Sequence, residues 1–132
     1  MFIKQLSVFL ENRAGSLEQA LKTLKDNNIN ISALSLADTN EFGLLRLIVD
    51  KPDEAKQALK QSGCTATIND VLAVKLEQRV GFLEELVQSV SKSGINIEYM
   101  YAASSDSDSA QMIVKTSDLQ GTEEVLKSLG AD

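Results

Sequence analysis

The chain has 132 residues, 43% of them hydrophobic, and a net charge of −6 that lies wholly in residues 69–132. This composition predicts a globular protein with a sound core, and its acidic excess argues against a nucleic-acid partner. One cysteine and no histidine make a disulfide, a metal site or another cofactor unexpected, and the lack of a roughly 20-residue apolar stretch or a secretory signal predicts a cytoplasmic protein without a membrane partner.

The first half of the chain predicts the element order β-α-β-β-α-β from its alternating and helical apolar spacings. Strands are expected at 2–10, 29–37, 42–49 and 64–68, with a hairpin turn at 38–41. The first helix carries Leu17, Ala20, Leu21 and Leu24 and ends at Asn27-Asn28, and the second runs from Pro52 to Gly63. Ser16 and Gln19 are placed to form a capping box at the first helix start.

The second half predicts the same order but lacks residues for a final strand. Strands are expected at 71–76, 95–103 and 110–115, with a polar tip at 104–109, a helix closed by Gly94 and a last helix at 122–129. The chain then stops at Gly130-Ala131-Asp132. Either the second sheet lacks one strand, or another segment or chain fills its place, because an unfilled edge is a natural site for strand addition.

An internal repeat links the two halves. At a spacing of 66 residues, the segment 8–35 matches 74–101 with ten identities in 28 positions. The identical positions include Glu11/Glu77, Arg13/Arg79, Gly15/Gly81 and the Ile-Asn-Ile runs at 29–31 and 95–97. The repeat predicts an α+β chain of two ferredoxin-like βαββαβ units side by side, residues 1–69 and 70–132, with antiparallel sheets and helices on one face.

Each repeat has a glycine turn between its first strand and first helix. Glycine permits a sharp turn, and the helix that follows exposes backbone N–H groups that carry partial positive charge and can hold a carboxylate. Asn12 and Gln78 in these turns offer both hydrogen-bond donors and acceptors, and Asn30 and Asn96 open the next strand. The combination suits a free α-amino acid, while the alternative is that glycine and amide only satisfy a tight turn.

The pattern Glu-Asn-Arg-x-Gly, helix, Ile-Asn-Ile, repeated in this frame, resembles the ACT domain, a regulatory module of amino-acid metabolism. The resemblance spans nearly the whole chain as two tandem copies, although Ala14 and Val80 replace the usual proline and Gln78 replaces asparagine. It implies a free amino acid bound at an interface between ACT units, in a non-enzymatic sensor that is likewise expected to form a homodimer. The candidate ligand-binding residues are Asn12, Ala14, Gly15, Ser16, Leu17, Asn30, Ile31, Gln78, Val80, Gly81, Phe82, Leu83, Asn96 and Ile97.

Two other functions are weighed against a free-standing sensor. The first is a regulatory subunit of a biosynthetic enzyme such as acetolactate synthase, because that family's small subunits carry a similar glycine loop. The second is a small enzyme that uses Cys64 or the acidic pairs Glu84-Glu85 and Glu123-Glu124. Cys64 lacks a histidine partner and begins an expected strand, and adjacent residues on a helix point apart, so a solvated surface is favoured for the acidic pairs. Phe82 stands where the first copy has Ser16, and a core or interface role is favoured for it over a ligand contact. Arg13 and Arg79 are expected to be exposed or paired with Glu11 and Glu77.

Overall fold

The computed structural model describes residues 1–38, 41–103 and 110–130 and divides into two compact units. The N-terminal unit is Lys4–Asn69, and the C-terminal unit is Asp70–Asp132 together with Met1–Ile3. Parts of the predicted turn at 38–41, the polar tip at 104–109 and the last two residues lie outside the described residues.

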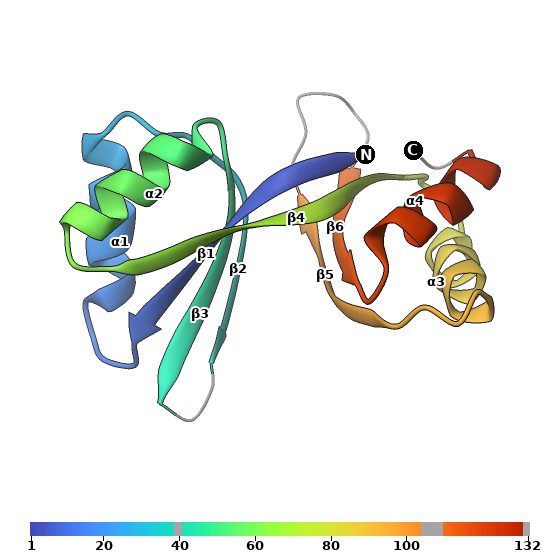
Figure 1. Cartoon of the computed structure of the whole chain (residues 1–132), viewed down its shortest axis with the longest axis horizontal. Helices are drawn as coiled ribbons and strands as arrows, with labels where there is room; N and C mark the ends of the chain where they lie inside the picture. The colour runs from blue at the N-terminus through green and yellow to red at the C-terminus, as the bar shows by residue number, and fades with distance from the viewer. Residues whose placement is uncertain (39–40, 104–109, 131–132) are drawn as a thin grey trace. The chain divides into compact units, whose positions relative to one another are not determined.

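The N-terminal unit has two helices on one face of an antiparallel sheet (Figure 1). The strand order is β2-β3-β1-β4, so β2 is an edge strand. Its elements are β1 (Phe2–Glu11), α1 (Ser16–Asp26), β2 (Ile31–Asp38), β3 (Phe42–Val49), α2 (Pro52–Gln61) and the first part of β4 (Thr65–Leu76). Leu6 and Val8 of β1 lie opposite Leu47 and Leu45 of β3, and these four side chains form the core with α1 and α2.

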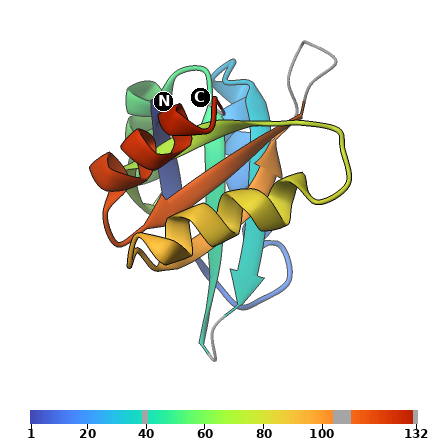
Figure 2. The ribbon, with the colours of Figure 1, turned by 90° about the vertical axis from the view of Figure 1, so that its right-hand side faces the viewer.

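The C-terminal unit repeats this arrangement. Its elements are the remainder of β4, α3 (Phe82–Lys92), β5 (Ile97–Ala103), β6 (Ala110–Thr116) and α4 (Leu119–Ser128). Figure 2 shows α3 and α4 lying next to each other over one face of this sheet. Val74 of β4 lies opposite Met112 of β6, and both contribute to a core completed by α3 and α4. The α+β fold with two βαββαβ repeats is therefore confirmed.

The first residues of the chain fill the place left by the missing final strand. The Ala73 N–H donates a hydrogen bond to the Met1 carbonyl at 2.9 Å, and Met1–Ile3 belong to the same compact unit as residues after 70. Of the two predicted alternatives, the structure therefore shows that another segment of the same chain borders the second sheet.

Apart from shifts of one or two residues at the ends of elements, such as the starts of β2 and β5, two predicted boundaries are wrong. The strands expected at 64–68 and 71–76 are one continuous strand, β4, because Asn69-Asp70 does not turn and Ser7 Oγ donates to Asn69 Oδ1 at 3.0 Å. The last helix starts at Leu119, three residues earlier than expected, because the Asp118 side chain accepts a hydrogen bond from the Gly121 N–H at its start.

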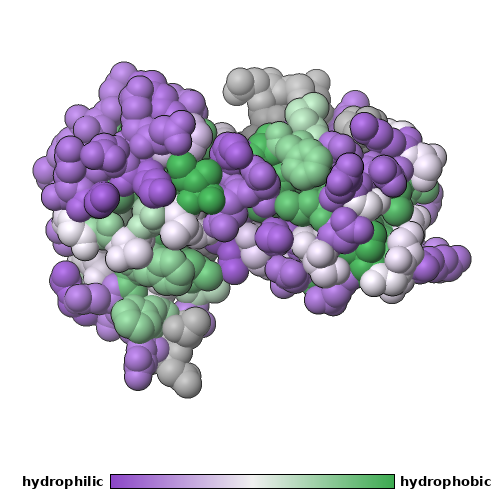
Figure 3. All heavy atoms as spheres, viewed as in Figure 1, coloured by the Kyte–Doolittle hydropathy of each residue, from purple (hydrophilic) through white to green (hydrophobic). Residues whose placement is uncertain are grey.

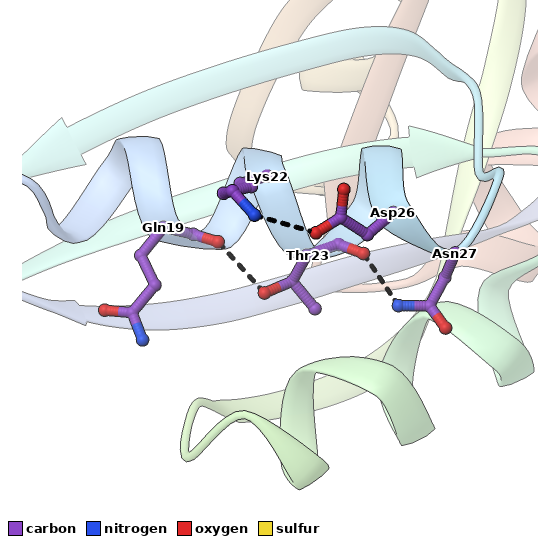
Figure 4. Close-up of polar contacts among 5 residues, drawn as sticks. All are labelled: Gln19, Lys22, Thr23, Asp26 and Asn27. Carbon is purple, nitrogen blue, oxygen red and sulfur yellow. Dashed lines mark hydrogen bonds and ion pairs between the residues drawn. The ribbon is translucent and has the colours of Figure 1, made fainter.

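Polar contacts along α1 fix where that helix ends (Figure 4). The Asn27 side-chain amide donates to the Thr23 carbonyl at 2.8 Å, and Lys22 pairs with Asp26 at 3.0 Å one turn apart. Asn28 then takes the left-handed conformation with φ 59°, which asparagine tolerates better than most residues. The helix thus stops as predicted at Asn27-Asn28, and the chain turns into β2.

Candidate functional site

A left-handed glycine begins the first helix of each unit. Gly15 has φ 92° and Gly81 has φ 86°, values that residues with a Cβ rarely adopt. No side chain caps α1 or α3. The first amide of each helix donates back to a loop carbonyl, Ser16 to Arg13 and Phe82 to Arg79. The next two amides of each first turn are left to solvent or to a ligand, at the positive end of the helix dipole.

The predicted capping box at Ser16 and Gln19 is wrong. Gly15 occupies the N-cap position, so Ser16 becomes the first helical residue, and its backbone N–H is bonded to the Arg13 carbonyl at 3.3 Å. The Gln19 N–H donates to the Gly15 carbonyl instead of to a serine hydroxyl. The Ser16 side chain faces inward and is buried.

The loop arginines pair with the neighbouring glutamates, as predicted. Arg13 Nε lies 2.7 Å from Glu11, and Arg79 Nε lies 2.9 Å from Glu77. Arg79 also lies 3.1 Å from Glu85, and its guanidinium lies 5.1 Å from the centre of the Phe82 ring. Hydrogen bonds with Glu85 and then Glu77 raise the pKa of Arg79. The second loop thus contains one carboxylate that the first loop lacks, because Gln19 corresponds to Glu85.

The two asparagines that precede β2 and β5 use their backbones in the same way. The Asn30 N–H donates to Asp50 Oδ1 at 3.0 Å, and the Asn96 N–H donates to Ser117 Oγ at 3.1 Å. Their carbonyls accept from the backbone N–H of Asp50 and Ser117 at 3.2 and 2.9 Å. These bonds hold the start of each strand in place and leave both asparagines exposed. Sequence reasoning missed Asp50 and Ser117, because they are 67 residues apart and so depart by one residue from the 66-residue spacing of the repeat.

The glycine loop and the asparagine of one unit lie at opposite ends of its sheet. Glu11 pairs with Phe42 at one end of β3, whereas Ile31 pairs with Val49 at the other. Seven residue steps at about 3.3 Å place these ends about 23 Å apart. In the C-terminal unit, Leu76 and Ile97 pair with the two ends of β6 in the same manner. A single unit therefore does not bring its loop and its asparagine to one small ligand.

The remaining candidate residues divide between surface and core. The exposed ones are Asn12, Ala14, Gln78, Val80 and Leu83, and the half-buried ones are Leu17, Ile31 and Ile97. Phe82 is 5% exposed and lies in the C-terminal core, in agreement with the core role favoured for it.

The two loops border different hollows. The first lines a pocket of about 130 Å³ together with Ser62, Gly63 and Cys64, three residues at the end of α2 that sequence reasoning did not connect with the loop. The second borders an open hollow of about 660 Å³ lined only by Leu76–Glu84. Asn30 lines neither of them and instead borders a hollow beside Asp50 and Lys51.

Neither a membrane-spanning helix nor a metal site is found in the described ranges. None of the described helices is both long and apolar enough to cross a bilayer. Across residues 1–38, 41–103 and 110–130, no three histidine, cysteine, aspartate or glutamate side chains cluster closely enough to hold a metal ion.

Comparison with known proteins decides the family. The model of the ACT domain pair family matches residues 1–129. The chain belongs to the ACT domain pair family. This ACT pair is 38% identical to a protein of known crystal structure from Bacteroides thetaiotaomicron, with a TM-score of 0.91 and coverage of 100% of this chain and 91% of the other.

Regulatory subunits of aspartate kinase share the fold of this ACT pair at low identity. The subunit from Thermus flavus is 17% identical with a TM-score of 0.70, over 98% of this chain and 94% of that one. The ligand-free subunit from Thermus thermophilus is 16% identical with a TM-score of 0.68, over 96% and 90%. The ACT pair thus has the same fold as these two subunits. No curated protein matches its sequence.

Proposed function

We propose that this ACT pair is a cytoplasmic, non-enzymatic sensor that binds a free amino acid and regulates amino-acid metabolism. The observation that carries the proposal is the duplicated helix start, in which Gly15 and Gly81 are left-handed and no side chain caps the helix. A loop that only had to make a tight turn would not need an uncapped helix start in both copies. Bare amides at a helix start form a site for a carboxylate.

The loop side chains complement the amides. The exposed carboxamide of Asn12 lies three residues before the Gly15 N-cap, so it can accept a hydrogen bond from an ammonium group or donate one to a carboxylate. An ideal Cβ on Gly15 would meet no heavy atom within 4 Å, so open space lies beside the loop for a ligand. These features match the head group common to all α-amino acids.

The separation of about 23 Å within a unit supports a site that is completed by a second unit. Two units placed with their α1 helices antiparallel would bring the Gly15 loop of one next to Asn30 of the other. One asparagine from each side would then enclose the ligand, and ligand binding would favour that arrangement of units over others. This geometry supports a homodimer in which each copy completes the site of the other.

An apolar strip along α1 offers a surface for such a contact. Leu17 and Leu21 line a shallow groove of about 510 Å³, and Leu83 and Val87 line a similar groove of about 560 Å³ at the matching positions of α3. The surrounding helical surface of the N-terminal unit is mainly hydrophilic (Figure 3). On the edge strand β2 of this unit, Leu34 and Leu36 are 53% and 50% exposed, although they point to the same face as the core.

The two loops are not equivalent, and the first is the better candidate site. Arg79 pairs with two carboxylates, whereas Arg13 pairs with Glu11 alone among the described residues, and Glu84 and Glu85 both lie in the first turn of α3. A ligand carboxylate would meet more negative charge at the second loop, and the longer Gln78 side chain changes its reach.

A thermal-shift panel of the twenty amino acids tests the function. A ligand present at 100 times its dissociation constant adds about 2.7 kcal/mol to the free energy of unfolding, so at least one amino acid should raise the melting temperature. Asn12→Ala and Asn30→Ala should each remove the response, and Gln57→Ala, an exposed carboxamide on α2, should not. A wild-type protein that ignores all twenty amino acids would contradict the sensor function.

Mixing the two variants tests the shared site. If Asn12 of one copy and Asn30 of the other hold the same ligand, a mixed dimer of Asn12→Ala and Asn30→Ala contains one intact site and one doubly altered site. Equal mixing with free exchange should then restore about a quarter of the first-loop sites, measurable by isothermal titration. If the mixture shows no binding in the titration while each variant remains dimeric, Asn12 and Asn30 of different copies do not contact the same ligand.

A second candidate function is a regulatory subunit that acts mainly through contact with a biosynthetic enzyme. The fold shared with aspartate kinase regulatory subunits supports it, as does the exposed apolar strip of α1. Co-purification of an enzyme with the tagged protein from its native host would favour this function over a free-standing sensor.

A further inference from the structure

A small, partly open pocket lies in the N-terminal unit, at the first turn of α1. Its volume is about 130 Å³, and its wall includes Ser16, Gln19, Ser62 and Cys64. Because a water molecule occupies about 30 Å³ in the liquid, this pocket has room for about four waters or one small organic molecule. All of its lining residues belong to the N-terminal unit, so it needs no second unit to exist.

The Ser16 hydroxyl points to a ligand in this pocket. Ser16 is only 9% exposed, and no described residue is recorded as its side-chain hydrogen-bond partner, since Gly15 rather than Ser16 caps the helix. No fully buried side-chain oxygen or nitrogen of the described residues lacks a partner. The remaining accessible surface of Ser16 therefore includes its hydroxyl, and the space that it reaches is the pocket.

The second copy of the repeat has an aromatic side chain at the position of Ser16. The inward row of α1 is Ser16, Ala20 and Leu24, and the inward row of α3 is Phe82, Leu86 and Val90. The bulky Phe82 packs into the C-terminal core where the first copy has a hydroxymethyl group. The chain thus contains a hydroxyl-bearing and an aromatic version of one structural position, and the residues at the end of α2 line only the pocket of the hydroxyl-bearing version.

We infer that this pocket binds a short-chain α-amino acid within the N-terminal unit alone. Glu11 and Arg13, which pair at 2.7 Å on its wall, present one negative and one positive group to the two charges of a zwitterion. The Gln19 carboxamide, the Ser16 hydroxyl and the Ser62 oxygen supply neutral donors and acceptors, and Ser62 already directs its proton to the Leu59 carbonyl. This inference rests on the proposed amino-acid-binding function but places one ligand in a pocket that the two-unit site does not use.

Cys64 makes the inference testable, because it is the only cysteine of the chain, is half-buried and is one of the residues that line the pocket. The rate of alkylation of the full-length protein by iodoacetamide is measured with glycine, alanine and serine, then with leucine and phenylalanine, and then with acetate and methylammonium. A short-chain amino acid at ten times its dissociation constant leaves about one site in eleven free, so alkylation should slow about tenfold. Leucine and phenylalanine have side chains that are too large for the pocket, and acetate and methylammonium each carry only one of the two charges of a zwitterion. None of these four compounds should slow the alkylation of Cys64.

Two variants of Ser16 separate binding from folding. Ser16→Phe should place an aromatic ring in the pocket, slow the basal alkylation and abolish the response to ligand. Ser16→Ala removes one neutral hydrogen bond and should weaken protection about two- to tenfold while keeping the fold. Ser91→Ala, on the exposed side of α3, is the matched control and should leave protection unchanged.

The outcomes distinguish this inference from the two-unit site. Protection that survives Asn30→Ala and is lost in Ser16→Phe supports the pocket. Protection that is lost in Asn30→Ala and survives in Ser16→Phe overturns the pocket and keeps the sensor function. Absence of protection by all three short-chain amino acids, in a protein whose melting temperature still rises with an amino acid, also overturns the pocket alone. Equal protection by leucine and phenylalanine overturns it as well.

Discussion

Replacing Gly15 by alanine should destabilise the protein although the new methyl group touches nothing. The added Cβ would have no heavy atom within 4 Å, so no clash contributes. The φ of 92° is left-handed, and holding an L-residue there costs about 1–2 kcal/mol. Alanine also restricts the unfolded chain, which stabilises by about 0.4–1 kcal/mol. The free energy of unfolding should therefore fall by about 1 kcal/mol.

Gly43→Ala is the matched control for this prediction. Gly43 lies in β3 without a left-handed φ, and an added Cβ would make ordinary contacts at 3.7 Å with Leu10 and Leu36. Only the effect on the unfolded chain remains, so this variant should be neutral or slightly stabilising. In urea denaturation, a slope of about 2 kcal/mol per molar would lower the midpoint of Gly15→Ala by about 0.5 M. Equal midpoints for the two variants would refute a loop held by a left-handed glycine.

Three further outcomes follow from other contacts. Thr122→Val should lower the free energy of unfolding by about 1–3 kcal/mol in thermal denaturation, because the buried Thr116 hydroxyl loses the hydroxyl that lies 2.8 Å from it. A loss no larger than that of the exposed Ser128→Ala would show that this hydrogen bond does not stabilise the fold. Asp118→Ala should cost about 1 kcal/mol in urea by removing the cap of α4, and Asp118→Asn should restore most of it. Leu21→Lys should convert dimers to monomers in sedimentation velocity if the α1 strip joins two copies, and an unchanged dimer would place the interface elsewhere.

Most of the fold could be predicted because the internal repeat reveals the order of its elements. The ten identities at a spacing of 66 residues include turn glycines as well as core positions, so they fix both the element order and the duplication. The junction between the copies was harder to predict. Asn69-Asp70 has the composition of a turn, yet its backbone continues as strand, because Asn69 has a tertiary partner in Ser7 that local patterns do not reveal.

The candidate site was predictable in its parts but not in its assembly. The repeated Gly15 and Gly81 mark the uncapped helix starts correctly, and the pairing of Arg13 with Glu11 follows from their spacing. The capping box failed because the left-handed glycine takes the N-cap position and shifts Ser16 into the helix. The approach of Cys64 to Ser16 depends on how α2 returns toward β1, a tertiary relation that no spacing in the sequence encodes.

The bond between Ala73 and Met1 affects how this protein can be divided for study. A clone that begins at residue 70 would contain every helix of the C-terminal unit but would leave the outer edge of β4 bare. Bare strand edges recruit other strands, so such a fragment should self-associate or precipitate. A fusion partner attached directly to Met1 would disturb the edge of the C-terminal unit, although the point of attachment is far from that unit in the sequence.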